Sequence, residues 1–123
     1  MLGNEAHASG IAQTINPASL SAGAANGGWL AVSDYEGDLL FVIEQGATTG
    51  NVVVKLQDAT DDSGTGSADI TGATTAALST ANTATKLIVQ ASKCRSHVRA
   101  VATVTTGPIL VGVALLARPK TTA

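Results

Sequence analysis

The sequence predicts an all-β protein, a β-sandwich or jelly roll of about seven or eight short antiparallel strands with an extended N-terminal arm. Apolar and polar residues alternate over several short runs, those runs are rich in Val, and Gly-containing connections separate them. With 123 residues the chain can build one core but not two. We divide it into an arm (residues 1–27), a sandwich domain (28–119) and a C-terminal tail (120–123).

The N-terminal arm is small and polar, rich in Gly, Ala and Ser. One apolar-alternating piece, Ile11–Ile15, stops before Pro17, and a loop is expected over residues 24–28. A segment of this composition buries too little surface to offset its ordering entropy. We therefore expect the arm to become ordered against a neighbouring molecule, with Ile11 and Ile15 among its contact residues.

A short strand over Trp29–Val32 and a turn over Asp34–Gly37 precede the first predicted hairpin. Its two strands, Leu39–Glu44 and 52–57, flank a Gly-containing connection, and side chains on alternate positions of each strand share a face. Leu39, Phe41 and Ile43 are expected on one face of the first strand, opposite Leu40, Val42 and Glu44, and the second strand has Val52, Val54 and Leu56 on one face, opposite Val53, Lys55 and Gln57.

Residues 59–82 are low in hydrophobicity, with one weak strand at Ala68–Thr71 and a helical turn over Ala73–Leu78. Strand periodicity returns in Thr85–Ala91, His97–Thr105 and Ile109–Ala117. The last strand is apolar on both faces, so it should be central in its sheet or covered by another subunit. Val98, Ala100, Ala102 and Val104 are expected to point inward. Leu87, Val89 and Ala91 share a face of their strand, and the last strand has Ile109, Val111, Val113 and Leu115 on one face and Leu110, Gly112, Ala114 and Leu116 on the other.

Composition narrows the classes of function. A net charge of −2 argues against a dedicated nucleic-acid partner, and no apolar run reaches the roughly 20 residues of a membrane span. Cys94 is the only cysteine, so an intrachain disulfide is impossible, and the N-terminus lacks the features of a secretory signal. The aromatic set is Trp29, Tyr35 and Phe41, so the core buries little area per residue and subunit contacts would add stability.

Two polar clusters are candidate sites. Asp58, Asp61 and Asp62 offer oxygen ligands for a cation, but their spacing differs from the calcium-loop pattern and favours ordinary turn chemistry. Lys93, Arg95, His97 and Arg99 alternate, so an extended chain would place all four on one side. This basic stripe is either a solvated strand face that pairs with carboxylates such as Glu44 or Asp58, or a contact with an acidic partner.

Catalytic and cofactor signatures are missing from the sequence. It contains no G-x-S-x-G, H-E-x-x-H or Walker-type pattern, and the stretch Ser63–Ser67 lacks the glycine spacing of a dinucleotide site. His97 has no evident acid or nucleophile partner in the sequence. We expect no catalytic residues, no cofactor and no small-molecule substrate.

The order of these elements resembles a known group. An apolar strand, an A-T-x-G connection (Ala47–Gly50), a V-x-V-K-L-Q-x-x-x-D-D-x-G run (Val52–Gly64) and an H-V-R-A-V-A-T-V-T-x-G-P strand (His97–Pro108) follow one another. This resembles the small β-sandwich structural proteins encoded in the head-gene region of tailed bacteriophages, some of which are capsid decoration, or cement, proteins. Asp58–Thr60 and Ser96–His97 depart from that group's usual residues.

The resemblance implies a non-enzymatic virion protein, made in the host cytoplasm and added to the capsid exterior as a trimer that binds the major capsid protein. The arm and the basic stripe would dock on the shell, and Val42, Leu110 and Leu116 would form the contact between subunits. Two alternatives stay open: another virion part, such as a head fibre base, tail or adaptor protein, and a carbohydrate-binding β-sandwich module. The second usually presents exposed aromatic rings, which are scarce here.

Overall fold

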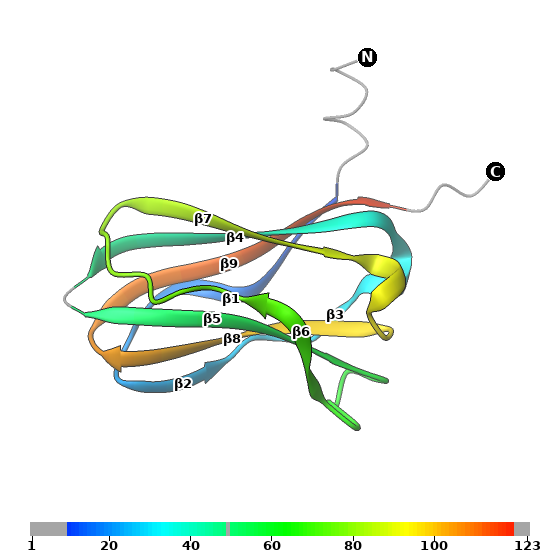
Figure 1. The fold of residues 1–123 in the computed structure, drawn as a ribbon, viewed down its shortest axis with the longest axis horizontal. Coiled ribbons are helices and arrows are strands. Elements are labelled where there is room, and N and C mark those ends of the chain that lie inside the picture. The colour runs from blue at the N-terminus through cyan, green and yellow to red at the C-terminus, as the bar shows by residue number, and fades with distance from the viewer. Residues whose placement is uncertain (1–9, 49, 120–123) are drawn as a thin grey trace, which may run out of the picture.

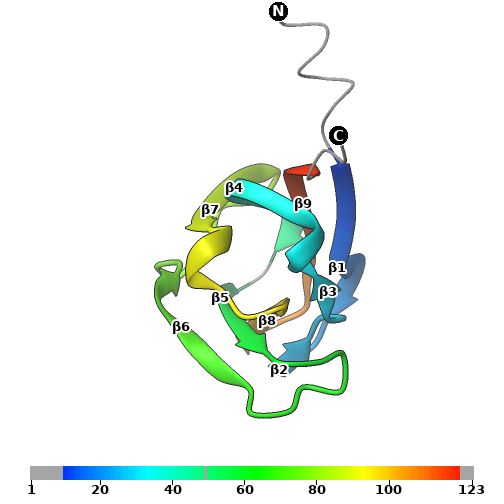
Figure 2. The ribbon, with the colours of Figure 1, turned by 90° about the vertical axis from the view of Figure 1, so that its right-hand side faces the viewer.

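The protein is a β-sandwich of two antiparallel sheets, described by a computed structural model over residues 10–48 and 50–119. One sheet, here sheet A, has the strand order β1-β9-β4-β7. The other, sheet B, has the order β2-β8-β5-β6, with the short β3 also paired to β8. Figure 1 shows the two layers from the side, and Figure 2 shows them from one end. The predicted all-β sandwich is confirmed.

Strands fill most of the described chain, and two short 3-10 turns, η1 and η2, stand beside them. Sheet A is built from β1 (Gly10–Leu20), β4 (Tyr35–Thr48), β7 (Thr83–Gln90) and β9 (Ile109–Pro119). Sheet B is built from β2 (Gly23–Asn26), β3 (Leu30–Ala31), β5 (Asn51–Ala59), β6 (Ala68–Thr74) and β8 (His97–Thr106). The turns are η1 (Val32–Asp34) and η2 (Ala91–Lys93).

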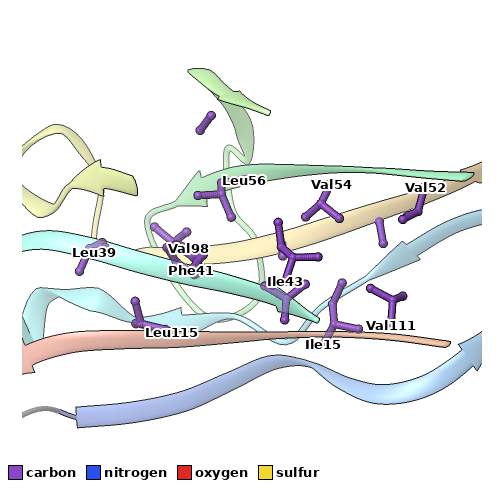
Figure 3. Close-up of a cluster of buried hydrophobic side chains, with 14 of the residues drawn as sticks. Ile15, Leu39, Phe41, Ile43, Val52, Val54, Leu56, Val98, Val111 and Leu115 are labelled. Carbon is purple, nitrogen blue, oxygen red and sulfur yellow. The ribbon is translucent and has the colours of Figure 1, made fainter. Parts of the chain in front are cut away.

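The core lies between the sheets, and the predicted alternation fills it. Leu39, Phe41 and Ile43 of β4 are fully buried, and they face fully buried residues of β5 such as Val54 and Leu56 (Figure 3). The inward-facing residues predicted for β8 and the Ile109 face predicted for β9 are buried too, while Leu87, Val89 and Ala91 are half-buried against the same cluster. Strand β9 is central in sheet A, as its two apolar faces predicted.

The predicted N-terminal arm differs from the structure over residues 10–26. These residues form β1, which pairs with β9, and β2, which pairs with β8, so they belong to both sheets. The expectation of an arm outside the sandwich is wrong for this part, because edge strands take their ordering energy from neighbouring strands instead of from their own composition. Residues 1–9 and the predicted tail, 120–123, lie outside the described residues.

Thr14 explains why β1 is held so firmly. Its buried hydroxyl donates to Gly28 O (2.8 Å) and accepts from Ala100 N (3.0 Å), so one side chain of sheet A bonds to the backbone beside sheet B. Gly27 N donates to Ala100 O (2.8 Å) and Gly28 N to Thr14 O (2.6 Å). A Cβ on Gly27 would lie 2.8 Å from Ala100 O, so only glycine fits where the chain passes between Thr14 and Ala100.

Two further local expectations are corrected. The helical turn over Ala73–Leu78 is absent: β6 continues to Thr74, and the chain then runs beside β5, with Leu78 bridging Val52. Pairing to β5 there overrides a weak helical preference. The expected strand over Trp29–Val32 shortens to Leu30–Ala31, because η1 begins at Val32.

Candidate functional site

An apolar row crosses the outer face of sheet A. Ile11 pairs with Leu116, Leu116 with Leu40 and Leu40 with Ile88, so the four side chains stand in line across all four strands. Ile11 is 74% exposed and Ile88 is 53% exposed, while the two leucines between them are partly exposed. A line of large apolar side chains on a water-facing sheet typically marks a contact with another protein.

An open hollow of about 270 Å³ lies beside this row on the same face. Its lining includes Pro17 of β1, Leu110 and Gly112 of β9, and Val42 and Glu44 of β4. Leu110 is 42% exposed. The structure therefore brings together Val42, Leu110 and Leu116, the three residues predicted for a subunit contact, on one surface.

Charged residues border the apolar row. Further along β9 and β4 from the Leu116–Leu40 pair, Arg118 Nε lies 3.8 Å from Glu36 Oε1. Asp38 is exposed on the same strand as Glu36. On the next row toward the hollow, Val42 pairs with Ala114 and Lys86, and Ala114 pairs with Gln13. The row itself is thus apolar out to its exposed ends, Ile11 and Ile88, whereas the neighbouring row is polar at both ends.

The outer face of sheet B carries a polar ladder, defined as Lys55, Asp69, Gln57, Arg99 and Trp29. Asp69 accepts from Lys55 Nζ (3.2 Å) and from Gln57 Nε2 (2.8 Å). Gln57 Oε1 accepts from Arg99 Nε (3.1 Å) and Nη2 (2.9 Å). The Arg99 guanidinium lies 4.5 Å from the centre of the Trp29 ring, a cation–π contact. Each member therefore has a partner within the chain.

Arg95 and Asp58 form a clamp at the end of the sandwich. Arg95 Nη2 (2.8 Å) and Nε (3.2 Å) donate to Asp58 Oδ1, and the Arg95 backbone N donates to Oδ2 (3.1 Å). Nη2 also reaches Gly66 O (2.7 Å), which ties the loop of residues 60–67 to the sandwich. Burial acts to raise the pKa of Asp58, but the hydrogen bonds and charge of Arg95 outweigh it and hold that pKa below its usual value.

The loop of residues 60–67 is held by its own carboxylate as well. Asp61 Oδ1 accepts from the backbone N of Ser63 (3.0 Å) and Thr65 (3.1 Å), and Oδ2 accepts from the Thr65 hydroxyl (2.6 Å). The Thr65 hydrogen bonds lower the pKa of Asp61. Gly64 packs on the Trp29 ring, with a positive φ of 80°. This is the turn chemistry that the Asp-rich sequence predicted.

The three aspartates considered for a cation are thus placed in different roles. Asp58 pairs with Arg95, Asp61 closes the loop, and Asp62 is exposed. Within residues 10–48 and 50–119 no three His, Cys, Asp or Glu side chains gather as metal ligands would. Asp58 and Asp61 therefore hold the loop of residues 60–67 and its attachment to the sandwich.

The basic stripe is not one continuous face. Lys93 ends the 3-10 turn η2, residues 94–96 are irregular, and β8 begins only at His97, so the alternation breaks. The expectation that an extended chain aligns all four residues is therefore wrong. Lys93 is exposed, Arg95 and Arg99 are engaged as above, and His97 Nδ1 lies 2.8 Å from Ser96 Oγ.

The two isoleucines that the sequence predicted as contact residues of the arm lie on different faces of sheet A. Ile11 joins the apolar row, whereas Ile15 is 6% exposed and belongs to the core. A β-bulge between Gln13 and Ile15 is the cause, because one extra residue moves the following side chains to the other face. Ile15 is therefore excluded as a contact residue for a partner.

A second open pocket, of about 450 Å³, lies between η1 and η2 and includes Tyr35, Glu36 and Cys94 in its lining. Burial, and after it the negative charge of Asp58, raises the pKa of the Cys94 thiol, which favours the protonated and less reactive form. In the part of the chain that the structure describes, every buried side-chain polar atom has a hydrogen-bond partner.

Sequence reasoning missed three members of these surfaces: Leu40, Ile88 and Trp29. Leu40 and Ile88 were readable as the outward positions of their strands, but their alignment depends on how β4, β7 and β9 pair. The role of Trp29 needs the loop of residues 60–67 folded over it. None of the described helical turns is long and apolar enough to cross a membrane.

The fold and the two surfaces define a class: a small all-β sandwich with one apolar and one polar outer face. Comparisons with protein-family models, with curated proteins and with solved structures found no match to this chain. Its function must therefore be argued from its surfaces.

Proposed function

We propose that this protein is a non-enzymatic structural protein of a bacteriophage virion, most specifically a capsid decoration protein that binds the assembled shell of the major capsid protein. The observation that carries the proposal is that the chain leaves a row of large apolar side chains on sheet A for another chain to cover, as a subunit of an assembly does, while its opposite surface is already ordered. A small sandwich that exposes large side chains across all four strands is suited to contact another protein surface.

The second support is rigidity at the opposite surface. The Arg95–Asp58 clamp, the Asp61 turn and the Trp29–Arg99 contact hold the loop of residues 60–67 on sheet B. A loop that is already ordered loses little entropy on binding, which suits a protein that docks at many equivalent positions. Lys93, exposed beside this end, supplies a charge for that contact.

The carbohydrate-binding alternative is weakened by the state of Trp29. Sugar stacking needs a free aromatic face, but the Trp29 ring lies under Arg99 and against Gly64. Phe41 is fully buried and Tyr35 is half-buried. Another virion part, such as a head fibre base, tail or adaptor protein, would use the same surfaces and differs in its binding partner.

The test is co-sedimentation of the purified protein with phage heads made from the same genome. Assembled shells should carry the protein into the pellet, whereas unassembled major capsid protein should not. Binding to purified tails instead would favour the alternative virion role, and no binding to any particle, or a clear signal on a glycan array, would refute the proposal. Lys93→Glu, at an exposed position, should weaken shell binding more at low salt than at high salt.

A further inference from the structure

The apolar row on sheet A has the same order of residue types from either edge of the sheet. From β1 to β7 its residues are Ile11, Leu116, Leu40 and Ile88, which gives the order Ile, Leu, Leu, Ile. Consider a two-fold axis that runs parallel to the strands, over the line between β9 and β4. Rotation about this axis lays β1 over β7 of a second copy and β9 over β4. The row then meets itself, with Ile11 opposite Ile88 and Leu116 opposite Leu40.

The neighbouring row has the same symmetry. It reads Gln13, Ala114, Val42 and Lys86, with small apolar side chains in the middle and polar ones at both ends. The same rotation places Ala114 opposite Val42 and Gln13 opposite Lys86. In these two rows apolar positions thus meet apolar positions, and the charged Lys86 stays at the edge, where water reaches it. One row further, the exposed Glu44 of β4 falls over Gly112 of the opposite copy, at the hollow.

The charges at the end of the face are complementary under this rotation. Arg118 stands on β9 at the level of Glu36 on β4. Because β9 of one copy lies over β4 of the other, each Arg118 would face Glu36 of the opposite copy. Two exposed pairs of opposite charge would then become one network of alternating sign.

Leu110 adds an apolar contact at the axis. A Cβ on Gly46 would lie 2.7 Å from Leu110 Cδ2, so the Leu110 side chain leans from β9 over the adjacent part of β4. This is the line over which the axis passes, and the two copies of Leu110 would meet there. Four strands about 4.8 Å apart and about 27 Å long present a flat area of about 500 Å². With its side chains, that face is of the order of the roughly 800 Å² per partner that stable interfaces bury.

We propose that the outer face of sheet A is the contact between two copies of this chain, related by a two-fold axis parallel to the strands. This contact goes beyond the decoration role. A dimer covers the outer face of sheet A, so a contact with the shell would fall to the surface of sheet B and the exposed Lys93. The dimer also differs from the trimer that the resemblance to phage proteins implies, because a face that matches itself closes after two copies.

The first experiment measures mass in solution. Light scattering over a concentration series should approach twice the mass of one chain, and Ile88→Lys should keep the mass at one chain. Thr103→Lys, which adds the same charge to an exposed position on sheet B, should leave the dimer unchanged. Both substitutions lie at water-exposed strand positions, so circular dichroism should show an unchanged fold.

The second experiment tests the axis itself by cross-linking in a Cys94→Ser background. Chains with Ile11→Cys and chains with Ile88→Cys, mixed and treated with a bis-maleimide that spans about 10 Å, should form a covalent dimer, because stacked sheets lie about 10 Å apart. Neither variant should cross-link alone. The two copies of position 11, like the two copies of position 88, would stand over opposite edges of the sheet, about three strand spacings (about 14 Å) apart in addition to the gap between the sheets.

A two-chain mass together with the 11–88 cross-link supports the proposal. A mass of one chain at every concentration, a mass of three chains, or a dimer that lacks this cross-link overturns it. Both measurements use the purified protein alone, so failure to bind phage heads would refute the decoration role without touching this result.

Discussion

The two outer faces of the sandwich differ in the side chains that they present to water. On sheet B, the side chains that cross the sheet are polar, and each one bonds to its neighbour, from Lys55 through Asp69 and Gln57 to Arg99. On sheet A, the corresponding row is apolar, and its outer members Ile11 and Ile88 are exposed. The first face is complete within one chain, whereas the second leaves apolar area for another molecule to cover.

This difference separates stability from association. Substitutions on the polar ladder and its clamp should change the free energy of unfolding, because they remove contacts already made within the chain. Substitutions on the apolar row should change assembly. They should leave the free energy of unfolding nearly unaffected at concentrations where the chain is monomeric, because dimer formation itself adds stability by mass action. Both statements require that the two sheets stay packed against each other. The close contact of Gly27 with Thr14 and Ala100 joins the two sheets, so its substitution is the first test.

Gly27→Ala should give the largest effect, a loss of about 3 kcal/mol in the free energy of unfolding. The added methyl would lie 2.7 Å from Thr14 O and 2.8 Å from Ala100 O, so both sheets would have to move. Urea unfolding followed by Trp29 fluorescence measures the loss. At Gly28 a Cβ would meet Thr14 O at 3.8 Å, an ordinary contact, so Gly28→Ala should cost far less. Equal losses in the free energy of unfolding for Gly27→Ala and Gly28→Ala would contradict the close contact at Gly27.

Asp58→Ala should cost about 2–3 kcal/mol, because Arg95 would lose its ion pair and three hydrogen bonds in a partly buried place. Urea unfolding at neutral pH measures this loss. The control, Asp62→Ala, removes an exposed carboxylate from the same loop and should stay within about 0.5 kcal/mol of the wild type.

The same pair of residues predicts a pH dependence. The pKa of Asp58 is held below its usual value, so the ionised carboxylate stabilises the fold fully above about pH 4, and this contribution is lost as pH falls through the lower folded-state pKa. The wild type should therefore lose stability more steeply than Asp58→Ala on acidification below about pH 4. Parallel acid-unfolding curves for the two proteins would show that the clamp contributes nothing.

Arg99→Ala should cost about 1 kcal/mol, from two hydrogen bonds to Gln57 and the contact with Trp29. Trp29 is the only tryptophan, so its emission reports the change directly: removal of the guanidinium should make the ring easier to quench with acrylamide. Arg99→Lys keeps the charge but loses the planar guanidinium. Its stability and its quenching should therefore lie between those of the wild type and of Arg99→Ala. An unchanged emission spectrum and quenching would argue against the cation–π contact.

Ile88→Lys should have the smallest effect on stability, within about 0.5 kcal/mol, because its side chain is largely exposed. Its effect should instead be on assembly, as proposed above. A large loss of stability in the monomeric protein would mean that the apolar row supports the fold and would remove the contrast between the faces.

Much of the fold was predictable from local pattern. The alternation in Leu39–Ile43, Val52–Leu56 and Ile109–Leu115 divided the side chains of each strand correctly between two faces, because strand periodicity is a property of a few adjacent residues. Where a bulge intervened, as between Gln13 and Ile15, the same rule placed Ile15 on the wrong face. The stripe from Lys93 to Arg99 failed for a related reason, since a 3-10 turn broke the extended chain.

By itself the sequence determined the class of the fold, the apolar core positions and the presence of unused apolar residues such as Leu110 and Leu116. Only the tertiary structure decided that residues 10–26 are part of both sheets, that Arg95 closes on Asp58, and that Ile11, Leu116, Leu40 and Ile88 stand in one line. The physical reason is the range of the interactions. Alternation is set by neighbouring residues, whereas register and strand order depend on pairing between segments that are distant in the chain.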